Sequence, residues 1–436
     1  MKQVIPLTLI VLFFSCKKQS VQKIVTTDID NFWSVYDKIK QTNDTILQYK
    51  LLQEIYIENA SQGLRDIIDA RRYSREDYIE AIHSYPKFWE SIRPNMSKID
   101  ENKKAIRESI QKLKTAYPDL KPSTIYFTVG SFRTGGTAKW NNVLIGSELA
   151  LGSDVTDISE LPEWRQPYYE DYKPLENLPL LCTHEYIHTQ QTEIVENLLA
   201  MCLYEGIAEF ISCKVTQEKS NTPALTFGKE NNEAITHKFI EDLYAPENNY
   251  NWLWGENQNE LKERDLGYYV GFKISERYYN SSSDKMRAVK DLIELDYYND
   301  KEVARIVDAS KFLPKSLEQI DSDYQLKRPK VVSISEFENG SKTVSPTLDK
   351  ITINFSEPLN GIHSSLDYGF LGKTTYPNID NNSRIWTNTN QSYTFNLKLE
   401  SNKQYQMIVS NFRLENGIRL KPFLIEFKTT KKPITI

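Results

Sequence analysis

The chain has 436 residues, of which 39% are hydrophobic and 26% are charged, and its formal net charge is −5. This length allows more than one domain. A mildly acidic chain with no basic patch interleaved with aromatic residues is a poor candidate for nucleic-acid binding. Neither composition nor charge excludes an exported, folded protein.

The first 16 residues predict an export signal. Lys2 precedes an apolar run from Val4 to Phe14, which is too short to span a bilayer but has the length of a signal-peptide core. The pair Ser15-Cys16 that follows resembles a bacterial lipobox, in which the cysteine is lipidated and becomes the first mature residue. The resemblance implies a bacterial envelope protein whose membrane anchor is the lipid on Cys16. Lys17 is not an aspartate, which favours the outer membrane.

Residues 17–120 predict an N-terminal helical region. Apolar residues recur at spacings of three and four, as in Phe32, Tyr36 and Ile39. Such stripes are typical of helix faces that pack in a core. A strand is expected over Thr124–Val129, followed by a glycine-rich stretch that lacks the Gly-Lys-Ser/Thr ending of a nucleotide loop. A second strand is expected over Asn142–Glu148.

The strongest chemical signal is His184-Glu185-Tyr186-Ile187-His188, an HExxH pattern typical of zinc hydrolases. On a helix, positions i and i+4 lie one turn apart on the same face. Both imidazoles can therefore reach one Zn²⁺, with Glu185 beside them as a general base. The other three histidines are isolated in the sequence.

A third ligand is expected from a second helix over about 196–210. Glu205 follows His188 by enough residues for the chain to turn and return beside the first helix. Glu209 lies one turn beyond Glu205 on the same face, where it can accept the second ring N–H of a ligating histidine. Glu193 and Glu196 are rival ligands, but they are too close to the first helix to turn back easily.

The segment Glu205-Gly206-Ile207-Ala208-Glu209 after HExxH resembles the gluzincin arrangement of thermolysin and aminopeptidase-N-like enzymes. More broadly, residues 28–325 resemble predicted zinc-dependent proteases of gluzincin type, often found as bacterial lipoproteins. The stretches that carry this resemblance are Phe32-Trp33, Tyr85-Pro86-Lys87-Phe88, Ser91-Ile92-Arg93-Pro94-Asn95, Tyr117-Pro118-Asp119, Gly135-Gly136-Thr137 and Gly267-Tyr268-Tyr269-Val270-Gly271.

This resemblance implies a zinc metallopeptidase core over residues 121–329, with Glu205 as the third ligand and Glu209 orienting the first histidine. It also implies that the strand before the HExxH helix forms the edge of the cleft and pairs with extended substrate through Val143, Leu144, Ile145 and Gly146. A tyrosine hydroxyl is expected to stabilise the oxyanion. Tyr268 is the first candidate and Tyr269 the second.

From about residue 330 the pattern changes to alternation, as in Ile351–Phe355 and Tyr393–Leu399. Short alternating strands over residues 330–436 predict a β-sandwich. The phrases Val344-Ser345-Pro346-Thr347 and Phe355-Ser356-Glu357-Pro358 resemble a bacterial Ig-like domain. Such a domain is expected to serve as a spacer or adhesion module.

The sequence therefore predicts an α+β protein: a mainly helical, gluzincin-like domain with a small sheet, followed by an all-β sandwich. The expected function is hydrolysis of peptide bonds by zinc-activated water, with a peptide or protein substrate. Two alternatives stay open. One is a catalytically silent surface lipoprotein that binds peptide or glycan, and the other is a zinc hydrolase that acts on a non-peptide bond.

Overall fold

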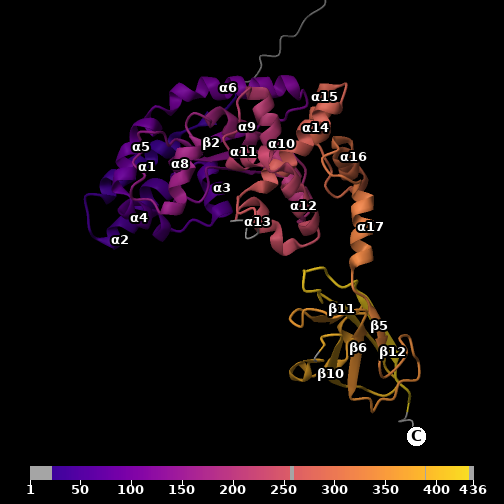
Figure 1. Ribbon diagram of the computed structural model, residues 1–436. Coiled ribbons are helices and arrows are strands. Elements are labelled where there is room, and N and C mark those ends of the chain that lie inside the picture. Colours follow the sequence, from indigo (N-terminus) through magenta and orange to yellow (C-terminus); the bar gives the residue numbers. More distant parts are fainter. Residues whose placement is uncertain (1–21, 256–259, 388, 432–436) are drawn as a thin grey trace, which may run out of the picture. The chain divides into compact units, whose positions relative to one another are not determined.

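The protein is an α+β protein in a computed structural model that describes residues 22–255, 260–387 and 389–431 (Figure 1). The expected signal and Cys16 lie outside these residues. The chain divides into two compact units. The first holds the described residues up to Glu193 together with Tyr204–Lys229 and Ser282–Leu295, and the second holds Ile194–Leu203, Glu230–Ser281 and the described residues from Asp296. No helix of the described residues is both long and apolar enough to cross a membrane.

The first unit begins with a group of amphipathic helices. Their apolar faces meet in an aromatic cluster, in which Trp89 contacts the rings of Phe32, Trp33 and Phe132. Ser74 and Asp77 form a reciprocal capping box at the start of one helix, as the Ser-x-x-Asp spacing favours. The elements are α1 (Thr27–Ile39), α2 (Thr45–Leu51), the π-helix η1 (Leu52–Ile57), α3 (Gln62–Arg71), α4 (Arg75–Ser84), α5 (Pro86–Ser97) and α6 (Ile99–Ala116).

A four-stranded sheet follows, in the order β1-β2-β4-β3. Its strands are β1 (Ile24–Val25), β2 (Thr124–Thr128), β3 (Gly136–Lys139) and β4 (Asn142–Gly146). β4 pairs in parallel with β2 and in antiparallel with β3, so β3 is an edge strand. The end of β2 is secured by Tyr56, whose hydroxyl donates to Val129 O at 2.6 Å and accepts from Val129 N at 3.0 Å.

Shorter elements complete the first unit. These are α7 (Ser147–Ala150), the 3-10 helix η2 (Glu163–Arg165), α8 (Gln166–Tyr172), α9 (Leu178–His188), the part of α10 (Leu198–Thr216) from residue 204 onward, α11 (Pro223–Glu230) up to residue 229, and α15 (Lys285–Ile293). The segment 152–178, which precedes the HExxH helix, contains η2 and α8.

The second unit contains helices and a strand-rich C-terminal region. Its remaining helices are α12 (Asn232–Asp242), η3 (Pro246–Asn248), α13 (Asn249–Leu253), α14 (Leu266–Ser281), α16 (Asp300–Ser310) and α17 (Leu317–Lys327). Tyr269 of α14 is buried, and its hydroxyl lies 3.0 Å from Asn232 Oδ1. The two compact units do not divide at residues 120 and 329. The domain boundaries expected at those residues stay a prediction.

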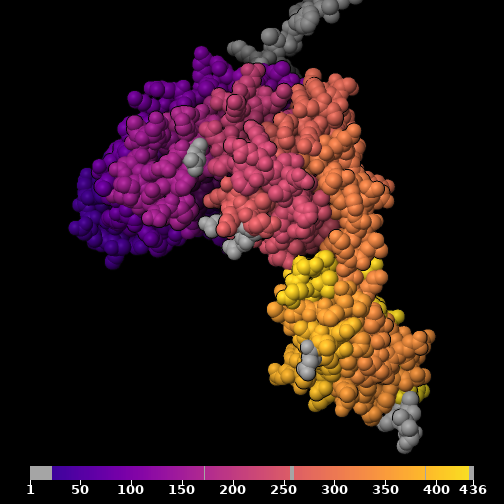
Figure 2. Space-filling view, viewed as in Figure 1, coloured from indigo at the N-terminus to yellow at the C-terminus, as the bar shows by residue number. Residues whose placement is uncertain are grey.

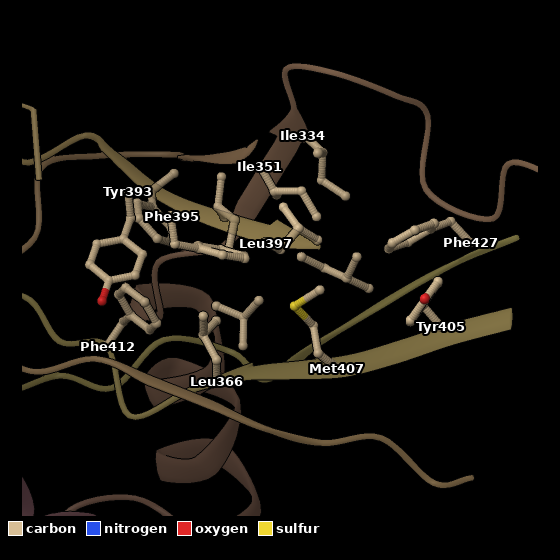
Figure 3. Close-up of a cluster of buried hydrophobic side chains, with 14 of the residues drawn as sticks. Ile334, Ile351, Leu366, Tyr393, Phe395, Leu397, Tyr405, Met407, Phe412 and Phe427 are labelled. Atoms are coloured by element: carbon tan, nitrogen blue, oxygen red, sulfur yellow. The ribbon is translucent and has the colours of Figure 1, made fainter. Parts of the chain in front are cut away.

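The C-terminal strands form two sheets around one apolar core. One sheet has the order β5-β6-β10-β8, with β9 also paired to β10, and the other has the order β12-β11-β7. Ile351 and Phe395 from the first sheet and Met407 and Phe427 from the second are buried together in this core (Figure 3). The space-filling view shows the surface that encloses them (Figure 2). The strands are β5 (Val331–Ile334), β6 (Lys350–Phe355), β7 (Ser365–Tyr368), β8 (Asn378–Ile379), β9 (Ile385–Trp386), β10 (Ser392–Lys398), β11 (Gln404–Ser410) and β12 (Phe423–Lys428).

Candidate metal centre

Helix α9 carries the HExxH pattern and is fixed on two sides. Thr183 Oγ1 donates to Ser109 Oγ of α6 at 2.9 Å. On another face, the Tyr186 hydroxyl accepts from the backbone N–H of Ser123, which directly precedes β2, at 2.8 Å. Pro179 lies in the first turn. A backbone N–H there has no partner within the helix, so the N–H that proline lacks costs little stability. Nearly the whole helix is buried, and these hydrogen bonds fix the helix that carries His184 and His188.

The two imidazoles converge as their spacing predicts. The Nε2 atoms of His184 and His188 lie 3.0 Å apart, and both side chains are almost fully buried. Glu205 of α10 points at the same place: its Oε2 lies 3.4 Å from His184 Nε2 and 3.3 Å from His188 Nε2. One donor atom from each of the three residues lies within 4.8 Å of the others.

This donor set fits zinc. Two imidazole nitrogens and one carboxylate oxygen, with a fourth position left for another ligand, form a common three-residue zinc arrangement. Among the described residues, these three form the one group of histidine, cysteine or acidic side chains whose donor atoms lie close enough to hold a metal ion. Glu193 and Glu196 are not members of it.

A carboxylate and an amide orient the two rings. His184 Nδ1 lies 2.8 Å from Glu209 Oε2, and because a carboxylate only accepts, Nδ1 is the donor and Nε2 is turned toward the centre. His188 Nδ1 lies 2.7 Å from Gln191 Oε1, and Gln191 Nε2 donates to Tyr204 O at 2.9 Å. This second contact fixes the amide of Gln191, so both histidines present Nε2 to the centre.

Gln191 and Tyr204 were not predicted as parts of the site. Gln191 follows His188 by three residues, a spacing that places it one turn along, but the sequence does not show that the chain continues to turn there. The Tyr204 ring stacks on the His188 ring with centroids 4.3 Å apart and planes at 12°. Its signal was its position directly before Glu205.

Charges inside the centre shift the pKa values strongly. Burial works to raise the pKa of Glu205, but His188 and His184 beside it bring that pKa far below its usual value. Burial works to lower the pKa of His184, but hydrogen bonds to Glu205 and Glu209 raise it well above its usual value. Burial also raises the pKa of Glu185. The buried carboxylates of Glu205 and Glu209 favour a positive charge in this centre.

Glu185 packs against β3. A Cβ built on Gly136 of β3 would lie 2.6 Å from Glu185 Oε1, so the carboxylate packs directly on this glycine. The expectation that Val143, Leu144, Ile145 and Gly146 form the edge that pairs with an extended ligand is wrong. They belong to β4, whose two neighbours already occupy its backbone groups.

The role expected for Tyr268 and Tyr269 stays a prediction. Tyr268 and Tyr269 belong to α14 in the second unit, and their expected role depended on hydrolysis. Cys182 and Cys202 are buried, Cys213 is half-buried, and none of the three forms a disulfide within the described residues.

The fold and the donor set define an α+β protein with a two-histidine, one-glutamate cluster of metal-binding type. Residues 15–251 match the family model described as gliding motility protein GldB, which is more than half of the chain. The chain therefore belongs to this family of gliding-motility lipoproteins, and association with the cell envelope follows from that membership.

This membership corrects two expectations. The family is not that of the predicted gluzincin proteases, and the expected function as a peptide-hydrolysing metallopeptidase is wrong for a chain of the gliding-motility family. The physical reason lies in what the motif specifies. HExxH and a later glutamate place donor atoms on two helices, but they do not specify the substrate cleft or the transition-state contacts that hydrolysis needs.

Comparison with curated proteins finds no match. Among solved structures, the chain is similar to the surface layer protein SbsC, domains 1–6, with 13% identity, a TM-score of 0.18, and coverage of 65% of this chain and 44% of that one. It is also similar to the catalytic module of the metalloprotease ZmpA from Clostridium perfringens, with 10% identity, a TM-score of 0.19, and coverage of 88% and 73%. The chain spans less than half the length of SbsC domains 1–6, and scores this low establish no shared fold.

Proposed function

We propose that this chain is a lipid-anchored envelope protein that holds a zinc ion and binds an extended peptide beside it without hydrolysing it. The observation that carries the proposal is the contact between Gly136 of β3 and Glu185 of α9, because it brings a free strand edge next to the His184–His188–Glu205 cluster.

The backbone of β3 supports a peptide as the ligand. Gly146 N–H donates to Gly135 O, so the backbone groups of residue 135 face β4. In an antiparallel pair this orientation alternates along the strand, so the groups of Gly136 and Ala138 face away from β4. Thr134 Oγ1 donates to Gly136 O. Within the described part of the chain, the N–H of Gly136 and both backbone groups of Ala138 remain to pair with an added strand.

The zinc would be held by His184, His188 and Glu205, with Glu209 and Gln191 orienting the rings. When bound, it supplies a positive charge that attracts a carbonyl or carboxylate oxygen of the ligand. The chain itself excludes water from the centre, since the three side chains are all nearly buried. Glu185 packs on β3 and bounds the site on that side.

The anchor would be lipid on Cys16, in the outer membrane. Membership in a lipoprotein family supports this, as does the signal-like N-terminus. The strand-rich region over residues 330–436 would serve as an Ig-like spacer. Replacing Cys16 by Ser should release the protein from the membrane fraction. If the variant stays membrane-bound, lipid is not the anchor.

Metal analysis of purified residues 17–436 tests the zinc site. About one zinc per chain is expected, and His184→Ala or His188→Ala should remove it. Glu196→Gln is the matched control, because Glu196 is exposed and outside the cluster. Stoichiometric zinc in either histidine variant would refute the site.

A labelled library of extended peptides tests binding and hydrolysis together. The zinc-loaded protein should bind a subset of the peptides, measured by fluorescence anisotropy, and mass spectrometry should show them intact. Cleavage that disappears in Glu185→Gln would overturn the non-catalytic proposal. Binding of glycan fragments in place of any peptide would change the ligand class.

A further inference from the structure

An exposed tryptophan stands at the far end of β3. Trp140 and Asn141 form the two-residue turn between β3 and β4, and Trp140 is 82% exposed with a φ of 56°. Tight hairpin turns of this kind favour glycine, asparagine or aspartate at residues with positive φ. A bulky side chain in the left-handed region is strained, and an exposed indole gains nothing from packing.

Neighbouring contacts tie the residues on either side of this turn to helix α3. Lys139 Nζ pairs with the carboxylate of Asp69. Asn142 Nδ2 donates to Asp66 Oδ2 at 2.7 Å, and Gln62 Nε2 donates to Asp66 Oδ1 at 2.9 Å. Asp66 and Asp69 both belong to α3, so the residues on either side of the turn are tied to one helix. The indole is therefore presented from a fixed base.

The tryptophan lies at a defined distance from the metal centre along the strand edge. Gly136, which contacts Glu185, and Trp140 are four residues apart, which is about 13 Å at about 3.3 Å per strand residue. A peptide paired with Gly136 and Ala138 continues along β3 to the turn. A glycan could stack on the indole, but it has no backbone groups in register with this edge.

We propose that Trp140 is the specificity anchor of the bound peptide and contacts an apolar or aromatic side chain about four residues from the one that lies at the metal centre. The inference rests on the proposed function, since it requires a peptide along β3. The strained backbone and the exposed indole of Trp140 are then explained by a contact that forms only when the peptide is bound. Backbone outliers of this kind cluster at binding sites.

The experiment uses zinc-loaded residues 17–436 and labelled alanine-rich hexapeptides in which a single phenylalanine moves from the first to the sixth position. Affinity should depend on the position of the phenylalanine. Trp140→Ala should weaken the best peptide by about tenfold or more, whereas Trp140→Phe should retain most of the affinity. Trp164→Ala is the matched control, because Trp164 is 64% exposed in the same unit and lies outside β3.

A second variant separates anchoring from folding. Trp140→Gly relieves the positive φ and should raise the melting temperature while it lowers peptide affinity. A structural role for Trp140 predicts the opposite shift in melting temperature. Unchanged affinity in Trp140→Ala and Trp140→Gly refutes the anchor and leaves the proposed function intact. Failure of the unchanged protein to bind any peptide refutes both, and binding of oligosaccharides or lipid vesicles through Trp140 refutes the peptide as ligand.

Discussion

The Glu185 carboxylate packs against the backbone of Gly136, with no room for a methyl group between them. A Cβ on Gly136 would lie 2.6 Å from Oε1, 2.7 Å from Cγ and 2.9 Å from Cδ of Glu185. Real Cβ atoms do not approach neighbours this closely, so one partner must move if residue 136 gains a side chain. A strand and a helix that are far apart in sequence are thereby fitted to each other.

Gly136→Ala should destabilise the protein by about 1–3 kcal/mol, because overpacking forces Glu185 or β3 to shift. Thermal denaturation measures the loss. In a Glu185→Ala background, the same change should cost much less, since the clash is gone. Equal losses in the two backgrounds would show that the contact with Glu185 is not the cause.

Gln191→Ala should weaken zinc binding by about 10- to 100-fold, because His188 loses the partner that fixes its ring. Competition with a chromogenic chelator measures this affinity. Gln190 is the matched control, because it precedes Gln191 in the sequence, is buried, and forms hydrogen bonds with Lys121 and Thr189. Gln190→Ala should therefore lower the stability of the protein and leave its zinc affinity unchanged. If Gln190→Ala weakened zinc binding more than Gln191→Ala, Gln191 would have no role in orienting His188.

Tyr56→Phe should cost about 1–3 kcal/mol of stability, because the Val129 N–H and C=O lose their partner inside the core. Tyr78→Phe is the comparison, since the equally buried Tyr78 hydroxyl makes no hydrogen bond among the described residues. Chemical denaturation of both variants should show the larger loss for Tyr56. A smaller loss for Tyr56 than for Tyr78 contradicts the prediction.

Glu148 should make stability fall as pH rises. Burial raises the pKa of Glu148, although the N–H groups of Gly130 and Phe132 donate to it. The unfolded chain thus gives up this proton at a lower pH than the folded chain does. The contribution from the raised pKa is complete below the usual value of 4.5 and is lost as pH rises through the folded value.

Glu148→Gln removes this titration, so its stability relative to the unchanged protein should improve as pH rises. Unfolding curves from about pH 4 to pH 8 measure the difference. Parallel pH profiles for the two proteins would show that Glu148 does not titrate in this range.

The sequence predicted the α+β class and the grouping of His184, His188 and Glu205. Helix periodicity brings the two histidines together, whereas Glu205 was expected from a second helix that returns beside the first and from the family resemblance. The sequence could not assign the edge strand. Only Asn142–Glu148 was expected as a strand here, whereas Gly136–Lys139 follows a glycine-rich stretch and becomes an edge strand through its pairing with β4. Gln191 was missed for a similar reason, since its role depends on a loop conformation after the helix ends.

The function was predicted less well than the site because a motif reports local donor geometry. The His184–His188 pair that can hold a metal suits hydrolysis only when substrate contacts surround it, and those come from segments distant in sequence. The family model covers residues 15–251 and so includes both histidines and Glu205. The site therefore lies within the part of the chain that the family model covers.

The fit between Gly136 and Glu185 also constrains how this chain can change over evolutionary time. Glutamate at position 185 leaves no space for a methyl group at position 136. A relative that keeps the glutamate should therefore keep the glycine. A relative that shortens the acid becomes free to accept alanine or serine on the strand. Paired variation of these two positions among related chains would therefore record where the acid is still needed.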